Sequence, residues 1–287
     1  MSLPNTATTT ATTVKATATE HPREIDWFIV AWFSVLHAVA IIGPFFFFSW
    51  GAVITAFVLY VLTGMVGITF GYHRLLSHRS FRAPRWLERI AATIGALALQ
   101  GTPAFWVATH RMHHAFVDTS ADPHDAKRGF WWSHLGWLMF KNHNLRDHLK
   151  MRKFARDIYS DPYLSWLSLD IQQITLQVAL GLVLLALGGW DYVVWGVFVR
   201  VVFVYHITWL INSATHRYGY RNFDSEDGSA NTWWVAILAF GEGWHNNHHA
   251  FPDVAPAGLK WWEVDPTWML IWSLERMGIV TQVKRHK

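Results

Sequence analysis

The sequence predicts an all-α integral membrane protein with four transmembrane helices and a cytoplasmic helical cap that holds a di-metal site. Two observations predict this fold class. Of the 287 residues, 52% are hydrophobic and only 15% are charged, whereas soluble domains carry about a quarter charged residues. In addition, three clusters of histidine lie beside apolar segments, at 73–78, 110–114 and 245–249.

Four apolar stretches are long enough to cross a bilayer, since one membrane helix needs roughly 20 residues. Aromatic residues stand at or beside most of their ends, as in the aromatic belts of membrane proteins. The connections between the first and second stretches and between the third and fourth are short and contain no Lys or Arg. The four stretches are Trp27–Phe48, Gly51–Tyr72, Trp166–Leu187 and Trp190–Ile211.

The basic residues predict the orientation of these helices. Residues 73–165 contain 14 Lys and Arg, the part from 212 onward contains 7, and the N-terminal tail contains 2. Because cytoplasmic loops are enriched in Lys and Arg, both termini and the long central loop are expected in the cytoplasm, at the cell's inner or plasma membrane. The net charge of +4 is distributed as in a membrane protein, so no nucleic-acid partner is expected.

A fifth apolar segment, Ile90–Val107, tests this topology. If it crossed the membrane, the second histidine cluster would lie on the opposite side from the others. Metal ligands must lie within about 2 Å of their ion, whereas the bilayer core is roughly 30 Å thick. We therefore expect an interfacial or buried helix that is broken near Pro103, where the polar sequence Gln100-Gly101-Thr102-Pro103 interrupts it.

The first 22 residues are rich in Thr and Ala and show no apolar periodicity. They have neither the apolar core of a signal peptide nor the arginines of a transit peptide. We predict a disordered tail over 1–22, followed by one membrane domain over 23–287.

The histidine clusters predict a metal centre. The motifs HRMHH and HNNHH share the spacing H-x-x-H-H, which places three imidazoles on one face of a helix. The chain has no cysteine, so thiolate sites and iron–sulfur clusters are excluded. Imidazole suits iron, zinc, copper or nickel, and so many nitrogens exceed the needs of one tetrahedral ion. Asn212 and His216, four residues apart after the fourth stretch, are further candidates, although an ordinary helix-capping pair has the same spacing.

Four motifs resemble those of membrane fatty acid Δ9 desaturases of the stearoyl type. They are GYHRLLSH, HRMHHAFVDTSADPHDAKRGFWWSHLGW, NSATHRYGYRNFD and GEGWHNNHHAFP. The similarity extends from about residue 27 to 283, and the HNNHH form and the segment GLKWWEVDPTW are most similar to bacterial, cyanobacterial-like acyl-lipid Δ9 desaturases.

The resemblance implies an O₂-dependent enzyme that inserts a cis double bond, expected at Δ9, into a saturated acyl chain on a glycerolipid or acyl-CoA. Its cofactor would be two iron ions that alternate between Fe²⁺ and Fe³⁺, with O₂ as co-substrate. In the family the position of Asn212 contacts one metal through water. The implied ligands are His73, His78, His110, His113, His114, His216, His245, His248 and His249.

This chemistry needs an oxidant, because an unactivated alkyl chain has neither a leaving group nor an acidic proton. The resemblance also implies a bent acyl tunnel with Gln100, Trp106, Thr208 and Trp209 at its kink. Glu242, Asp118, Asp122, His124 and Asp125 are candidates to orient the metal ligands, and salt-bridged surface positions are equally compatible with the aspartates.

The resemblance leaves the carrier of the acyl chain open. Animal acyl-CoA enzymes have Arg-Asp before the second histidine motif, where this chain has Ala108-Thr109, which favours a lipid-linked substrate. The heme motif of a fused cytochrome b5 domain is absent from the sequence, so a separate electron donor of the ferredoxin or cytochrome b5 type is expected. Membrane lipids are expected partners.

Two other functions are compatible with the histidine clusters. A membrane di-iron hydroxylase acting on alkanes or lipids begins with the same hydrogen abstraction. A metal transporter would place polar ligands near the middle of the membrane, but the predicted spans contain few such residues, mainly Arg200 and His206. Arg200 is expected to pair with Asp170 or Gln177, because an unpaired arginine in a membrane helix is costly.

Overall fold

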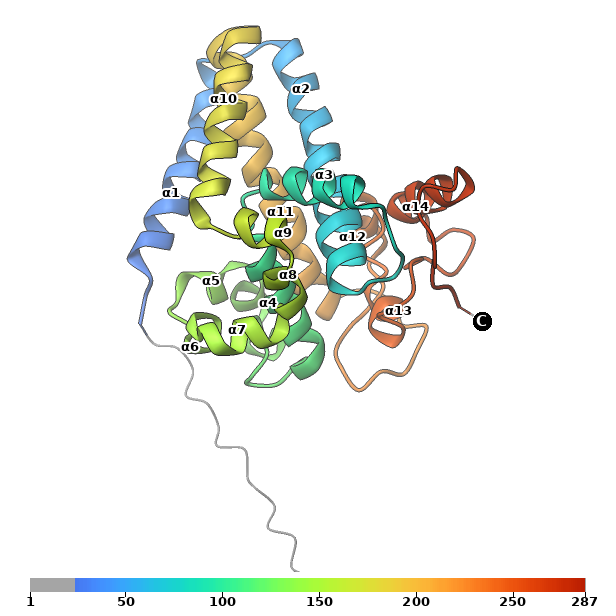
Figure 1. Cartoon of the computed structure of the whole chain (residues 1–287). Helices are drawn as coiled ribbons and strands as arrows, with labels where there is room; N and C mark the ends of the chain where they lie inside the picture. Colours follow the sequence, from blue (N-terminus) through green and yellow to red (C-terminus); the bar gives the residue numbers. More distant parts are fainter. Residues whose placement is uncertain (1–23, 287) are drawn as a thin grey trace, which may run out of the picture.

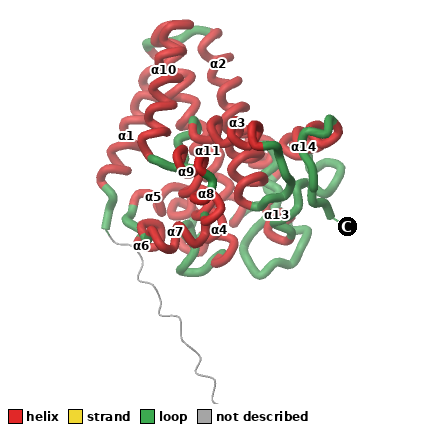
Figure 2. The backbone as a smooth tube through the Cα atoms, viewed as in Figure 1, coloured by secondary structure: helices red, strands yellow, loops and turns green. Residues whose placement is uncertain are grey.

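The computed structural model describes residues 24–286, which form helices and loops with only isolated β-bridges. The predicted tail over 1–22 lies outside the described residues. Figures 1 and 2 show two layers, with a bundle of long helices standing on a layer of short helices and loops. An all-helical fold is therefore confirmed for this part of the chain.

The bundle is built from three helical stretches that change type along their length. These are α1 (Trp27–Ile42) with η1 (Gly43–Phe45), α2 (Trp50–Tyr60) with η2 (Val61–Ser77), and α10 (Asp170–Val193) with η5 (Val194–Val199), α11 (Arg200–Ser213) and η6 (Ala214–His216).

The second layer consists of shorter helices. They are α3 (Arg85–Ala96), α4 (Pro103–Phe116), η3 (Ala126–Arg128), η4 (Trp132–Gly136), α5 (Trp137–Met139), α6 (His143–Arg146), α7 (His148–Phe154), α8 (Arg156–Ser160), α9 (Pro162–Leu167), α12 (Trp233–Leu238), α13 (His245–Ala250) and α14 (Pro266–Arg276).

Three helical stretches of the described residues are long and apolar enough to cross a membrane: Trp27–Phe45, Trp50–Ser77 and Asp170–His216. Their outward faces are apolar and exposed, as shown by Phe45 at 84% and Leu187 at 73% relative exposure. Large exposed apolar surfaces of this kind mark contact with a partner or a membrane.

The third stretch reverses direction at Gly188 and Gly189. Both glycines leave the helical region of backbone space, and Gly189 has φ +70° and ψ −160°. After the reversal, Val197 packs against Leu184, although a continuous helix would separate these two residues by roughly 20 Å. The stretch is therefore two helices that lie side by side, as Figure 1 shows.

The apolar segment over 90–107 is broken as predicted. Helix α3 ends at Ala96, and α4 begins at Pro103. Leu99 and Gly101 adopt positive φ between them, and Thr102 caps α4 by accepting a hydrogen bond from the backbone nitrogen of Phe105 at 3.2 Å. Proline suits the first turn of a helix because it lacks an N–H, so this sequence starts a new helix.

A close helix contact positions the first histidine cluster. Helix η2 has π-type hydrogen bonding, which occurs often at functional sites. A Cβ on its Gly67 would lie 2.7 Å from the Cα of Gly95 in α3. The absence of side chains at these two positions lets η2 pack directly on α3, with His73 at its lower end.

Arg200 is buried and paired, as expected from its place in an apolar helix. Its guanidinium donates hydrogen bonds to the carbonyl oxygens of Gly196 and Leu97 and to Oε1 of Gln177, the last at 3.4 Å. Of the two partners considered from the sequence, Gln177 is therefore the one that Arg200 contacts.

Because the chain reverses at Gly189, adding one methyl group there is expected to lower the stability of the protein more than adding one elsewhere in the helix. Gly189→Ala is expected to destabilise the protein by about 1–3 kcal/mol, because the conformation at Gly189 is essentially restricted to glycine. The measurement is thermal unfolding in detergent. Gly181→Ala is the control, since its Cβ would meet only Val197 at 4.0 Å. Equal melting temperatures for the two variants would contradict the strained reversal.

Candidate metal centre

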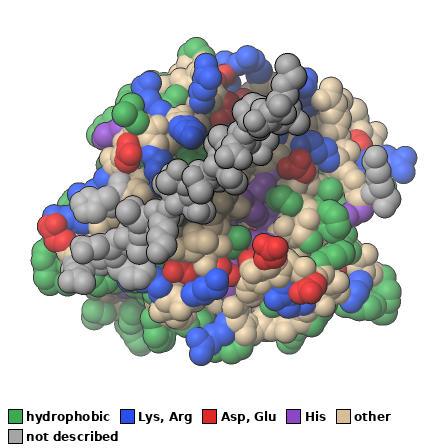
Figure 3. Space-filling model, turned by 90° about the horizontal axis from the view of Figure 1, so that it is seen from below, with side chains coloured by type: hydrophobic (Ala, Val, Ile, Leu, Met, Phe, Trp, Pro, Cys, Tyr) green, Lys and Arg blue, Asp and Glu red, His purple; other side chains and the backbone are tan. Residues whose placement is uncertain are grey.

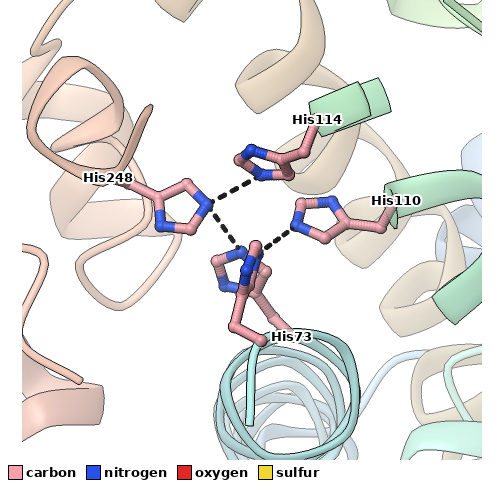
Figure 4. Close-up of side chains that lie close together, drawn as sticks. His73, His110, His114 and His248 are labelled. Atoms are coloured by element: carbon pink, nitrogen blue, oxygen red, sulfur yellow. Dashed lines mark hydrogen bonds between the residues drawn. The ribbon is translucent and has the colours of Figure 1, made fainter. Parts of the chain in front are cut away.

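Four parts of the fold supply the nine predicted ligands. Helix α4 carries His110, His113 and His114, and α13 carries His245, His248 and His249. His73 lies in η2, His78 caps its end, and His216 ends η6. Figure 4 shows the rings of His73, His110, His114 and His248 pointing toward one another from three separate segments.

The nine histidines form two groups, in each of which one nitrogen per ring lies within 4.8 Å of the others. The first group has five members and the second has four. The groups are His73, His78, His110, His114 and His248, and His113, His216, His245 and His249. Both groups are protein sites that could hold a metal ion.

Carboxylates hold the outer nitrogens of several rings. Nδ1 of His73 lies 2.9 Å from Glu242, and Nδ1 of His113 lies 2.9 Å from Asp122. Nδ1 of His249 lies 2.8 Å from Asp227. Nδ1 of His216 is 3.6 Å from Asp118, a longer contact. A carboxylate on Nδ1 fixes the proton there and leaves Nε2 with a free lone pair.

The inner Nε2 atoms then face one another. Nε2 of His73 lies 3.2 Å from that of His248, and Nε2 of His113 lies 3.3 Å from that of His249. Burial lowers the pKa of His113 and His248 well below the ordinary histidine value, so these rings are neutral and carry one proton each. In the His113–His249 pair Asp122 and Asp227 hold the protons on Nδ1, so both Nε2 atoms carry lone pairs, which repel at this distance unless a cation lies between them.

The spacing fits a shared metal ion. Two imidazole nitrogens bound at about 2.0–2.1 Å, with angles between 90° and 109°, lie roughly 2.8–3.4 Å apart. The Nε2 atoms of His114 and His248 are separated by 3.0 Å, and those of His216 and His245 by 3.1 Å. The donor set and its spacing therefore fit bound metal ions.

A buried arginine holds the carboxylate behind His73. Arg74 donates to Glu242 at 3.0 Å and to both carboxylate oxygens of Asp265 at 2.9 and 3.0 Å. Burial opposes the charge of Glu242, but Arg74 and His73 outweigh it and lower the pKa of Glu242. Glu242 is therefore ionised and is held beside Nδ1 of His73, where the proton of the ring stays.

A second arginine joins the elements that carry the ligands. Arg111 of α4 donates to the carbonyl oxygens of Leu76 and Ser77, at the end of η2, at 2.7 and 3.0 Å. It also donates to Asp157 of α8 at 2.7 and 3.0 Å. Arg111 is the immediate neighbour of His110, so these bonds fix the second histidine cluster relative to the first.

Two cavities meet at the histidines. One, of about 330 Å³, extends from His110 and Asn212 toward α1 and the start of α10. The other, of about 50 Å³, is lined by His73, His113 and His245 and extends between η2 and α11. The residues common to both are Trp106, His110, Thr208 and Asn212. Figure 3 shows histidine side chains near the middle of the face opposite the bundle.

The predicted tunnel residues lie together in the larger cavity. Gln100 donates from its side-chain nitrogen to Oγ1 of Thr208 at 2.7 Å and accepts from the indole of Trp106 at 3.3 Å. Trp209 lines the same cavity. The hydrogen bonds between Gln100, Trp106 and Thr208 fix the wall beside His110.

The candidates for orienting the ligands divide into two sets. Glu242 and Asp122 contact metal-site histidines, and Asp118 lies near His216. Asp125 instead accepts a hydrogen bond from the backbone nitrogen of Lys127 at 3.0 Å. His124 packs on His113 with ring centroids 4.3 Å apart, and burial lowers the pKa of His124 to about 3.

Sequence reasoning missed Asp227 and Arg111. Asp227 lies in an acidic loop and 22 positions before His249, so no helical spacing links the two. Arg111 stands inside the HRMHH motif, directly after the predicted ligand His110. Its position next to His110 was the only hint in the sequence. A charged side chain that points away from the ligand face of the helix needs a hydrogen-bond partner elsewhere in the fold.

Comparisons with known proteins find related sequences over most of the chain. Residues 48–279 match the family model described as fatty acid desaturase. The chain is 52% identical to the sn-1 stearoyl-lipid 9-desaturase of Anabaena variabilis, over 93% of this chain and 97% of the relative. It is 48% identical to the sn-2 palmitoyl-lipid 9-desaturase of Nostoc sp. (strain 36), over 91% and 90%. It is 44% identical to an acyl-CoA 5-desaturase of Anemone leveillei, over 87% and 76%.

Removing the carboxylate behind His249 is expected to lower the affinity for metal. Asp227→Asn is expected to weaken metal binding about 10- to 100-fold, because an amide orients the imidazole less strongly than a carboxylate. The measurement is metal content of the purified protein after dialysis against a graded chelator. Asp224→Asn is the matched control on the same exposed loop. An unchanged metal content in Asp227→Asn would contradict the role of this carboxylate.

The Arg111–Asp157 ion pair is expected to stabilise the fold to an extent that depends on pH. Burial opposes ionisation of Asp157, but Arg111 and then Arg79 outweigh it and lower its pKa to about 2. The stabilisation is therefore fully present above the ordinary Asp pKa of about 3.9 and is lost as the pH falls through about 2.

The corresponding variant is Asp157→Asn. It is expected to lower the melting temperature equally at pH 7 and pH 5, with the difference from the native protein narrowing below about pH 4. Asp253→Asn is the control, because Asp253 is 73% exposed in its pair with Lys284 and such pairs contribute little. A difference that vanishes already at pH 5 would show that the pair is not responsible.

Proposed function

The chain belongs to the fatty acid desaturase family and inserts a double bond into a saturated acyl chain, and we propose that it does so at Δ9 of acyl chains carried by membrane glycerolipids. The observation that carries the proposal is the junction of two cavities at the two histidine groups. An acyl chain that fills both cavities presents its middle, rather than either end, to the histidines.

The carrier is inferred from the relatives. The Anabaena and Nostoc proteins are named lipid 9-desaturases, whereas the less similar Anemone protein is named an acyl-CoA desaturase. Thr109 also lines the larger cavity, at a position where animal acyl-CoA enzymes have a charged residue. Both observations favour a glycerolipid.

The site is proposed to hold two iron ions, one in each histidine group. Bound iron would supply the oxidising power that removes two hydrogens from the chain while O₂, with two electrons and two protons, is reduced to water. All nine histidines would serve as ligands, and Asn212 at the junction would contact one ion through water. Glu242, Asp122 and Asp227 keep protons on Nδ1, so that Nε2 remains a ligand.

The chain's other residues bind and orient the substrate. Gln100, Trp106 and Thr208 form a hydrogen-bonded wall beside His110, and we propose that the acyl chain bends around this wall. The apolar lining excludes water from the reacting carbons, which limits side reactions of a strong oxidant. Trp209 closes the wall from α11 and packs on Phe33 of α1 with ring centroids 5.3 Å apart.

The membrane arrangement is proposed to comprise four spans. The stretch Asp170–His216 has 47 residues, or about 70 Å as one straight helix, which is over twice the bilayer core. The reversal at Gly188 and Gly189 divides it into two spans of suitable length. With α1 and α2 these make four proposed spans. From the distribution of Lys and Arg, we propose that both termini and the metal centre lie in the cytoplasm. There a separate electron donor of the ferredoxin or cytochrome b5 type would supply the electrons.

The function predicts a specific product. Expression in a host without Δ9-unsaturated lipids is expected to yield a new cis monoene, and His249→Ala is expected to reduce it at least about 100-fold because a ligand is lost. The measurement is mass spectrometry of the host's lipids. His148→Ala, an exposed histidine of α7, is the matched control.

The product mass also discriminates between reactions. A loss of two hydrogens is expected, whereas a gain of oxygen would identify a hydroxylase and contradict the proposed reaction. Full activity of His249→Ala would contradict the proposed site.

A further inference from the structure

The larger cavity has a mouth at the lower ends of α1 and α10. Ile29 and Trp32 line it from α1, Leu138 from α5, and Asp170 from the start of α10. Figure 1 shows these ends of α1 and α10 on the same side of the molecule, where the bundle meets the layer of short helices. The mouth therefore lies at the level where the apolar bundle begins.

The residues around this mouth face outward and are apolar. Trp27 and Phe28 on α1 are 71% and 75% exposed. Leu169 and Ile171, on either side of Asp170, are 52% and 61% exposed. Clustered exposed residues of this kind suit the boundary of a bilayer, so both sides of the mouth are suited to contact with lipid.

A short strap borders the mouth on its other side. We define the strap as residues 24–26 paired with residues 139–141. The backbone nitrogen of Asp26 donates to the carbonyl of Met139, and that of Lys141 donates to the carbonyl of Glu24, both at 2.8 Å. The strap joins the start of α1 to the end of α5, one turn from Ile29 and directly after Leu138.

The strap also neutralises the cations next to the mouth. Lys141 forms an ion pair with Glu24, and Arg146 forms one with Asp26. Among the described residues that line the cavity none is Lys or Arg. Asp170 is exposed at the rim and forms no ion pair with any cation of residues 24–286. The mouth is therefore apolar with an acidic rim.

We propose that this mouth admits the acyl chain of a membrane glycerolipid sideways from the bilayer and discriminates against soluble acyl-CoA by charge. The inference rests on the proposed function and adds the route and its selectivity. The head of acyl-CoA carries several phosphate charges, which need free Arg or Lys. At this mouth they would meet Asp170 and two cations already paired with acids.

The test is photo-cross-linking with the full-length protein in phosphatidylcholine vesicles. In one arm, a trace of phosphatidylcholine carries a diazirine on its acyl chain. In the other arm, the same diazirine acyl group is supplied as acyl-CoA from solution. Mass spectrometry maps the labelled residues. The phospholipid is expected to label Trp32, Leu138 and the inner residue Gln100, whereas acyl-CoA is expected to label them at least about fivefold less.

A variant makes the charge argument falsifiable. Glu24→Gln with Asp26→Asn frees Lys141 and Arg146, and asparagine can still cap α1. This pair of changes is expected to raise labelling by acyl-CoA roughly fivefold, the upper range of one exposed ion pair, without changing labelling by phospholipid. Asp224→Asn with Glu226→Gln is the control, with two acids removed from an exposed loop. If the strap variant does not fold, Asp170→Lys is expected to have the same effect.

The outcomes are separable from those of the proposed function, because cross-linking requires neither metal nor turnover. Equal cavity labelling by both probes in the native protein would overturn the inference. Phospholipid labelling confined to outward residues such as Val35 would also overturn it, as would unchanged acyl-CoA labelling in the strap and Asp170→Lys variants. Double-bond formation measured on the same preparation tests the proposed function independently.

Discussion

The structure depends on how carboxylates hold the outer nitrogens of buried imidazoles. Glu242, Asp122 and Asp227 each lie against Nδ1 of one ring and keep its proton there, and the free Nε2 lone pairs converge inside. Without a cation, this convergence is repulsive, and burial denies the rings the protons that would relieve it. The fold must therefore hold together a cluster of rings that a bound cation would stabilise.

The surrounding architecture supplies that restraint. Arg74 fixes Glu242 and Asp265 in a buried network, and Arg111 joins the end of η2 to α4 and α8. The direct contact between Gly67 and Gly95 places η2 against α3. Breaking a buried pair such as Arg74–Glu242 leaves an uncompensated charge, so Arg74 couples the stability of the fold to the geometry of the site.

Much of this arrangement could be predicted from the sequence, because it depends on local signals. The break before Pro103 follows from its cap and proline, and the helical spacing in HRMHH and HNNHH placed histidines on common faces. Pairings between distant segments had no such signal. Asp227 reaches His249 through a loop, and the paired strap between Glu24–Asp26 and Met139–Lys141 depends on two segments meeting only in the folded chain.

The most direct test is X-ray absorption spectroscopy of the purified protein at the iron edge, combined with metal content. The account predicts about two iron ions per chain, each surrounded mainly by nitrogen at roughly 2 Å. Fewer than one ion per chain in fully active protein, or a first shell made mainly of oxygen, would contradict it.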